Sequence, residues 1–222
     1  MSILVLGANG GVGKQIVAKL KEENKEVSAA YRKDDQVDKA IGEGYDARNV
    51  DVEKHEIDEL ADKFKDIDQL VFSVGSGGST GDDKTIIVDL DGAVKAIEAS
   101  KKAGVKHFVM VSTYDSNREA FDSRKDLKPY TIAKHYADNH LRDSGLKYTL
   151  VHPGTLENGP GTGNVDIAEH FDGGGSVPRE DVASVIVDVL GNEKFQGGEF
   201  QVISGSEPIE DALNNYYQIK RW

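Results

Sequence analysis

The chain contains no cysteine among its 222 residues. Disulfide bonds, thiolate metal sites and thiol chemistry are therefore excluded. The sequence also lacks a long apolar run: Ile3–Leu6 has only the length of a strand, and no basic segment precedes it. We therefore expect neither a signal peptide nor a membrane span, and we expect a cytoplasmic protein.

Basic residues are in the minority, with 27 Lys and Arg against 39 Asp and Glu and a net charge of −12. Nucleic acids and anionic membranes bind basic surfaces, so neither is expected as a partner. The six histidines show no ligand spacing such as H-E-x-x-H, and no metal site is predicted. We expect a small-molecule substrate, and the oligomeric state, monomer or homodimer, stays open.

Strand-like and helix-like segments alternate along the whole chain. The expected strands are Ile3–Leu6, Val27–Tyr31, Gly44–Ala47, Gln69–Val74, His107–Val111, Tyr148–Val151 and Phe200–Ile203. The expected helices are Val12–Glu22, Ile57–Phe64, Lys84–Ala103, Pro129–Ser144, Arg179–Leu190 and Ile209–Tyr217. This alternation predicts an α/β fold, a Rossmann-like doubly wound parallel sheet with helices on both faces. We expect a single domain over residues 1–222 with a small C-terminal substrate lobe, in which 153–178 form a lid loop.

A glycine motif, Gly7-x-x-Gly10-x-x-Gly13, joins the first strand to the first helix. Glycine has no Cβ to keep a phosphate away, and a helix N-terminus offers free N–H groups and a partial positive charge. The motif predicts that a dinucleotide binds here, the alternative being a purely structural turn. The residues expected to contact this cofactor are Gly7, Asn9, Gly10, Gly11, Val12 and Gly13.

A basic pair, Arg32-Lys33, ends the second strand, where dinucleotide folds meet the adenosine ribose. Arginine suits the 2′-phosphate of NADP because its charged planar fork bonds two oxygens, whereas an acidic residue would bond the 2′-hydroxyl of NAD. The pair favours NADP(H) over NAD(H). The alternative is that Asp34 or Asp35 faces the ribose.

Two further strand ends supply candidate cofactor contacts. Asp51 and Val52 are expected beside the adenine, unless Asp51 instead caps a helix beginning near Glu53. Small residues after the fourth strand should let the backbone pass beneath the cofactor, and the alternative is an ordinary turn. These residues are Ser73, Val74 and Gly75.

The chain resembles the short-chain dehydrogenase/reductase superfamily, in its atypical, NmrA-like branch with an epimerase-like glycine motif. The resemblance is carried by Gly7-x-x-Gly10-x-x-Gly13, Arg32-x-x-x-Gln36, Tyr130 with Lys134, and Arg179-x-Asp181-Val182-Ala183. The chain is similar to NAD(P)-dependent epimerase/dehydratase proteins over essentially its whole length. The resemblance implies that the segment after the sixth strand lies along the nicotinamide, namely Pro153, Gly154, Thr155 and Leu156.

The candidate catalytic residues are Ser112, Tyr130 and Lys134. Tyr130 and Lys134 are one helical turn apart, and a nearby ammonium lowers the pKa of a phenol, so Tyr130 can act as acid and base. The resemblance implies that Lys134 also bonds the nicotinamide ribose and that Ser112 orients the substrate oxygen. The alternatives are that Tyr130 only packs, or that Thr113 or Tyr114 serves instead of Ser112.

Two departures from the family pattern bear on activity. Asp89 lies where asparagine is usual, and a carboxylate cannot donate a hydrogen bond as an amide does. His152 stands before Pro153-Gly154 where arginine is usual.

We predict an NADP(H)-dependent oxidoreductase that transfers hydride to or from a small carbonyl or quinone-like substrate. The alternatives are an NADP(H)-binding redox sensor without chemistry and an NAD(P)-dependent epimerase/dehydratase. The short remainder after His152 leaves little room for a nucleotide-sugar pocket.

Overall fold

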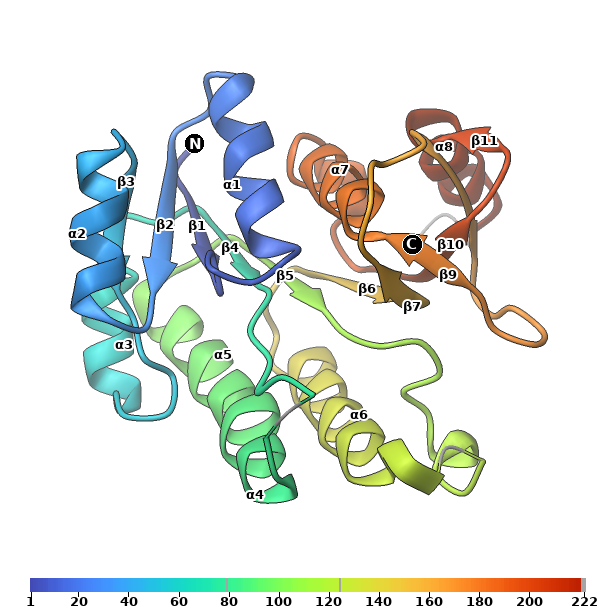
Figure 1. Ribbon diagram of the computed structural model, residues 1–222, viewed down its shortest axis with the longest axis horizontal. Helices are drawn as coiled ribbons and strands as arrows, with labels where there is room; N and C mark the ends of the chain where they lie inside the picture. Colours follow the sequence, from blue (N-terminus) through green and yellow to red (C-terminus); the bar gives the residue numbers. More distant parts are fainter. Residues whose placement is uncertain (79, 124, 221–222) are drawn as a thin grey trace.

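Nine strands form one sheet in the computed structural model, which describes residues 1–78, 80–123 and 125–220 (Figure 1). Its central strands are the apolar runs of the sequence. Its strands are β1 (Ile3–Leu6), β2 (Val27–Tyr31), β3 (Asp46–Asn49), β4 (Gln69–Phe72), β5 (His107–Val111), β6 (Tyr148–Pro153), β8 (Asn164–Ala168), β10 (Gly198–Ser204) and β11 (Glu207–Pro208). A separate pair joins β7 (Thr155–Glu157) to β9 (Ser176–Pro178).

Helices connect the strands and cover both faces of the sheet (Figure 1). The α-helices are α1 (Gly13–Glu22), α2 (Asp34–Gly42), α3 (Ile57–Lys63), α4 (Asp82–Lys84), α5 (Gly92–Ala103), α6 (Lys128–Asp143), α7 (Arg179–Leu190) and α8 (Ile209–Lys220). Shorter turns are the π-helical η1 (Thr85–Asp91) and the 3-10 helices η2 (Arg118–Ala120), η3 (Lys125–Leu127) and η4 (Glu193–Phe195). None of the described helices is both long and apolar enough to span a membrane.

Seven strands of the sheet run parallel in the order β3-β2-β1-β4-β5-β6-β10. The order reverses between β1 and β4, as it does in a Rossmann fold. The predicted α/β class is therefore confirmed. The sheet is not wholly parallel, because β8 pairs antiparallel with both β10 and β11.

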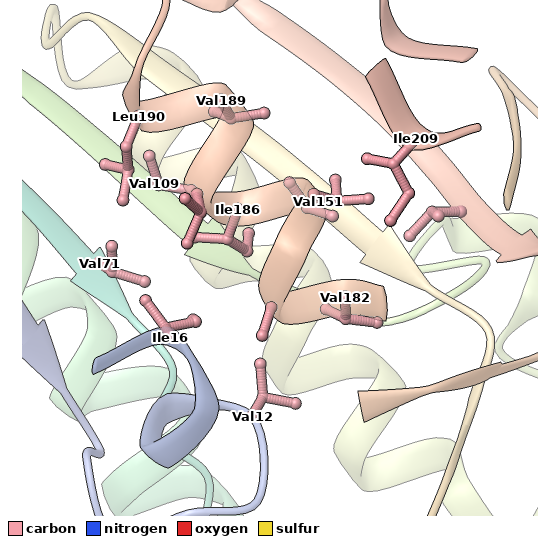
Figure 2. Packing of buried hydrophobic residues seen from close by; sticks show 14 of the residues in the cluster. Val12, Ile16, Val71, Val109, Val151, Val182, Ile186, Val189, Leu190 and Ile209 are labelled. Atoms are coloured by element: carbon pink, nitrogen blue, oxygen red, sulfur yellow. The ribbon is translucent and has the colours of Figure 1, made fainter. Parts of the chain in front are cut away.

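Side chains of the central strands alternate between two apolar layers. Val5 faces the layer formed with α1, α7 and α8, whereas Leu4 and Leu6 face the layer formed with α3, α5 and α6. This is the period of two expected for strands buried on both faces. Figure 2 shows Ile16 and Ile186 gathered with strand valines in the first of these layers.

Several expected boundaries were wrong. Helix α2 was not expected, because only Ala40 of its nine residues is buried and its apolar stripe of Val37, Ala40 and Ile41 spans little more than one turn. The strand expected at Gly44–Ala47 begins instead at Asp46, since Gly44 has a left-handed φ of 80° and ends the preceding turn. The segment expected to form a lid loop, 153–178, contains three short strands: β7 pairs with β9, and β8 pairs with β10 and β11.

Candidate functional site

A groove runs along the carboxyl ends of the parallel strands and consists of two adjoining cavities. The first cavity, about 400 Å³, lies over β1, β2 and β4. The second, about 470 Å³, lies over β4, β5 and the start of α6. Both are lined by Gly10, Ser73, Val74, Gly75 and Ser76. They form a continuous site where the strand order reverses, the position at which ligands bind in open α/β sheets.

The glycine turn brings α1 hard against the strand ends. Gly7 has a left-handed φ of 82°, and a Cβ there would overlap the carbonyl oxygen of Ser73. A Cβ on Gly13 would in turn overlap the carbonyl oxygen of Gly7. Gly10 lines both cavities, and a Cβ there would lie 3.1 Å from the carbonyl oxygen of Gly7. Together with the absence of acidic residues from the first turn of α1, this cradle fits a phosphate group.

Arg32 and Gln36 line the first cavity at the end of β2. Lys33, the other member of the predicted basic pair, is the exposed N-cap of α2. It is not among the described residues that line either cavity. The Asp34 carboxylate accepts a 2.7 Å hydrogen bond from the Asn49 amide. Lys84 of α4 also lines the first cavity and is ion-paired with Glu53.

Asp51 and Val52 form the wall of the first cavity opposite the glycine turn. The Asp51 carboxylate accepts a 3.1 Å hydrogen bond from the Glu53 N–H, so it closes a turn as well as lining the cavity. The helix that Asp51 was thought able to cap does not begin near Glu53, since α3 starts at Ile57. Val52 packs under Gly92 of α5.

The second cavity brings together the three candidate catalytic residues, Ser112 at the end of β5 and Tyr130 and Lys134 on α6. Lys134 is only 1% exposed, and its Nζ donates a 3.1 Å hydrogen bond to the Val111 carbonyl. Burial lowers the pKa of Lys134, and the carboxylates of Asp138 and Asp89 oppose that shift.

The Ser112 hydroxyl hydrogen is used within the protein and is not offered to a substrate. It donates a 2.6 Å hydrogen bond to the buried Asp138 carboxylate, which also accepts one from Ser116. The network continues through His152, whose Nε2 lies 2.9 Å from Glu199. Ser112 therefore offers lone pairs rather than a hydrogen to the second cavity.

Asp89, the departure from the usual asparagine, is buried in η1 and accepts a 3.0 Å hydrogen bond from the Ser76 N–H. Its other oxygen would lie 3.2 Å from a Cβ placed on Gly75. The carboxylate thus holds the loop after β4 against the groove, a task that needs only an acceptor.

Of the four residues expected along the nicotinamide, Pro153 to Leu156, only Leu156 is among the described residues that line the second cavity. Leu156 lines the second cavity, whereas Pro153 is buried and Thr155 is exposed in β7. Gly154 packs against the Gly175 backbone and the Ile203 side chain. A residue not predicted for the site, Arg179, reaches the second cavity from the start of α7. The sequence shows the motif Arg179-x-Asp181-Val182-Ala183. It does not show that Arg179 contacts Gly11, because the two residues lie far apart along the chain.

Comparison with known proteins agrees with this geometry. The NAD(P)H-binding family matches residues 7–193, and the chain belongs to that family. A Bacillus subtilis protein named an uncharacterized sugar epimerase is 41% identical over 96% of this chain and 99% of its own length. Among solved structures, a Bacillus halodurans protein described as an NAD-dependent epimerase/dehydratase has a TM-score of 0.89, with 36% identity over 97% of this chain and 99% of that one.

An oxidoreductase from Lactococcus lactis has a TM-score of 0.88 and 31% identity, covering 98% of this chain and 97% of that one. The chain is thus an NAD(P)-binding protein of an oxidoreductase- and epimerase-like family. This confirms the resemblance inferred from the glycine motif.

Proposed function

We propose that this protein is an NADPH-dependent reductase of a small conjugated carbonyl or quinone-like compound, with Tyr130 as its acid and base. The observation that carries the proposal is the continuous groove, which leads from Arg32 past the glycine turn to Ser112, Tyr130 and Lys134. A dinucleotide laid along it would have its adenosine phosphate at one end and its nicotinamide at the other.

The preference for NADPH rests on the side chains at the end of β2. Arg32 lines the first cavity together with Lys84, whose ammonium is paired with Glu53. Asp34 and Asp35 are the residues that could instead bond an unmodified ribose; neither is among the described residues that line the first cavity, and Asp34 is held by Asn49. An arginine left to face the ribose suits a 2′-phosphate, which accepts two hydrogen bonds from one guanidinium.

The residues of the second cavity divide the chemistry between them. A bound nicotinamide would supply the hydride. The Tyr130 hydroxyl donates its proton to the substrate oxygen, and the Lys134 ammonium, one helical turn away, favours the phenolate that is left. Because the Ser112 hydrogen is donated to Asp138, Ser112 does not donate to a carbonyl oxygen in this arrangement, and Tyr130 is the donor.

The substrate class is inferred from the walls of the second cavity. Apolar side chains of Val111, Leu127 and Leu156 form part of its lining, and the nicotinamide and a small substrate would share its volume of about 470 Å³. We propose that residues 153–178 form the substrate side of the site, since Leu156 already reaches it. A relative with 29% identity over 58% of this chain and 50% of its own length is named a sanguinarine reductase, and this name supports a reductase.

The test begins with titration of the wild-type protein with NADPH and NADH, followed by a panel of carbonyls and quinones scored by oxidation of the reduced cofactor. Tyr130→Phe should abolish turnover and leave the Kd for NADPH within about twofold, because only the acid is removed. Tyr136→Phe on the exposed side of α6 is the matched control and should keep wild-type turnover. Unchanged turnover in Tyr130→Phe would remove the catalytic assignment. Binding of NADPH without turnover of any acceptor would favour the sensor.

Arg32→Ala tests the choice of cofactor. Loss of a charged hydrogen-bonding partner should weaken NADPH about tenfold to a hundredfold and NADH by much less, since NADH has no 2′-phosphate. Calorimetric titration of both cofactors measures the difference. Equal losses would show that the 2′-phosphate is bound elsewhere.

An epimerase is the second candidate, favoured by the name of the Bacillus subtilis relative. Such an enzyme returns the hydride to its substrate, so it has no need to release cofactor between turnovers. It predicts oxidised cofactor that stays with the purified protein and is released when the protein is denatured. An absorbance scan of the denatured supernatant separates this case from a reductase.

A further inference from the structure

Arg179 packs directly against the glycine turn. A Cβ added to Gly11 would be 2.6 Å from the Arg179 Cδ and 2.9 Å from its Nε. The same side chain lines the second cavity beside Gly10 and Val12. The side chain of the first residue of α7 thus packs against Gly11, and its guanidinium lies beside the place where α1 begins.

Neutral oxygens hold this guanidinium in place. Its Nη1 donates to the Leu156 carbonyl at 3.1 Å and to the Asn158 amide oxygen at 2.9 Å. Among residues 1–78, 80–123 and 125–220, no carboxylate forms an ion pair with Arg179. The hydrogen bonds of the described residues leave its Nε and Nη2 available.

The adjacent carboxylates of α7 are occupied elsewhere. Glu180 pairs with Lys19 and accepts from the Gly161 N–H, and Asp181 accepts from the N–H groups of Thr162 and Gly163. The acidic side chains that line the second cavity are Asp82, Asp89 and Asp126, and Asp89 is bonded to the Ser76 N–H. The charge of Arg179 is therefore left for a ligand.

Two positive features meet at this point of a chain whose net charge is −12. Helix α1 has no acidic residue in its first turn and no side-chain cap at Val12, so its terminal N–H groups and dipole face the groove. Arg179 lies beside them, in contact with Gly11. A diphosphate over the glycine turn would receive backbone N–H donors from the turn and guanidinium donors from Arg179 next to it.

We propose that Arg179 holds the diphosphate of the dinucleotide against the glycine turn. The proposal rests on cofactor binding under the proposed function. It also connects the cofactor to the C-terminal segment, because the nitrogen that binds Leu156 and Asn158 belongs to the same rigid guanidinium. Occupation of the diphosphate position thereby holds the β7 segment at the edge of the second cavity.

Two cofactor fragments separate this role from that of Arg32. ADP-ribose carries the diphosphate without a 2′-phosphate, and adenosine 2′-monophosphate carries the 2′-phosphate without a diphosphate. Calorimetry on Arg179→Gln should show ADP-ribose and NADPH weakened about tenfold to a hundredfold, with the adenosine 2′-monophosphate Kd within about twofold of wild type. Arg32→Gln should give the reverse pattern for the two fragments.

Arg118→Gln is the matched control, because Arg118 bonds Tyr136 away from the groove, and it should bind both fragments as wild type does. Thermal unfolding without ligand should show Arg179→Gln folded. The proposal is overturned if Arg179→Gln binds ADP-ribose as tightly as wild type, or if it loses both fragments equally. Failure of the wild-type protein to bind NADPH and NADH would overturn the proposed function itself, a result distinct from either.

Discussion

Two buried histidines, His107 and His152, carry different charges because their partners differ. His107 lies between the Gln69 amide and the Thr149 hydroxyl, and Thr149 gives its own hydrogen to the Phe195 carbonyl. One ring nitrogen therefore accepts and the other donates, as in a neutral imidazole. Burial lowers the pKa of His107 to about 4.

His152 has acceptors at both ring nitrogens, the Thr113 carbonyl at 3.0 Å and the Glu199 carboxylate at 2.9 Å. Both nitrogens must donate, so the ring is an imidazolium. Burial alone would lower the pKa of His152, but the bond to Glu199 and the charge of Asp138 raise it above its ordinary value. Arg142 and His152 in turn lower the pKa of Glu199 to about 2 against the effect of burial.

His107 should make the protein sensitive to mild acid. Between its unfolded pKa of 6.5 and its folded value of about 4, the unfolded chain binds more protons, so stability falls as the pH falls through this window. The total loss is about 3 kcal/mol, at up to about 1.4 kcal/mol for each pH unit. Urea unfolding at pH 7, 6 and 5 should show a flatter dependence in His107→Gln than in wild type. The control is His170→Gln, at an exposed histidine, which should keep the wild-type dependence of stability on pH. If His107→Gln also kept the wild-type dependence, His107 would not be the source of the acid sensitivity.

Residues of the site could be predicted where local sequence determines their place. The glycines of the first turn follow a strand and precede a helix, and Tyr130 and Lys134 share a helix face, so spacing alone placed them. Lys84 and Arg179 reach the groove from elements far along the chain. No local pattern encodes such a contact, because it depends on how those elements pack.

At the scale of elements, the segment expected as one helix over Lys84–Ala103 is divided. It consists of α4, the π-helical η1 and α5. An apolar repeat does not distinguish π from α turns over so short a stretch, and π turns are frequent at functional sites. Here η1 places Val88 in the first cavity and Asp89 against the loop after β4.

The join between η1 and α5 gives a prediction. In Gly92→Ala the new methyl would lie 2.8 Å from Cγ2 of Val52, which lines the first cavity. Overpacking costs about 1–3 kcal/mol and outweighs the gain of up to about 1 kcal/mol in helix propensity. We expect a loss of about 1 kcal/mol in the free energy of unfolding and a severalfold weaker NADPH.

Gly42→Ala is the control for that variant. Gly42 ends α2 with no atom near its Cβ position and without a left-handed φ, so this change should leave stability equal or higher. Denaturant titration and NADPH calorimetry on both variants provide the measurement. If Gly92→Ala were as stable as Gly42→Ala and bound NADPH as tightly, the Val52 side chain would have moved aside at no cost in free energy, and the prediction would be wrong.

At the scale of the whole molecule, the groove is lined by residues from many different parts of the chain. Its walls come from the loops after β1 to β5, from α6 and from the start of α7. A ligand that binds only the assembled groove stabilises the folded state by mass action. At about a hundred times its Kd the gain is about 2.7 kcal/mol.

We therefore expect saturating NADPH to raise the melting temperature by about 5–10 °C, since 1 kcal/mol corresponds to about 2–4 °C in a chain of this size. Differential scanning fluorimetry with NADPH and NADH at equal concentrations measures the effect. NADH should give the smaller rise. A melting temperature unmoved by both would contradict dinucleotide binding in the groove.

By itself the sequence determined the alternation of strands and helices, the glycine turn and the helical pairing of Tyr130 with Lys134. These features depend on hydrogen bonds and side-chain periodicity within a few residues, which the chain carries locally. Tertiary structure alone decided the antiparallel edge at β8, the Ser112–Asp138 bond and the meeting of Arg179 with Gly11. Each of those depends on packing between distant segments, where the free energy of burial, rather than local preference, selects the partner.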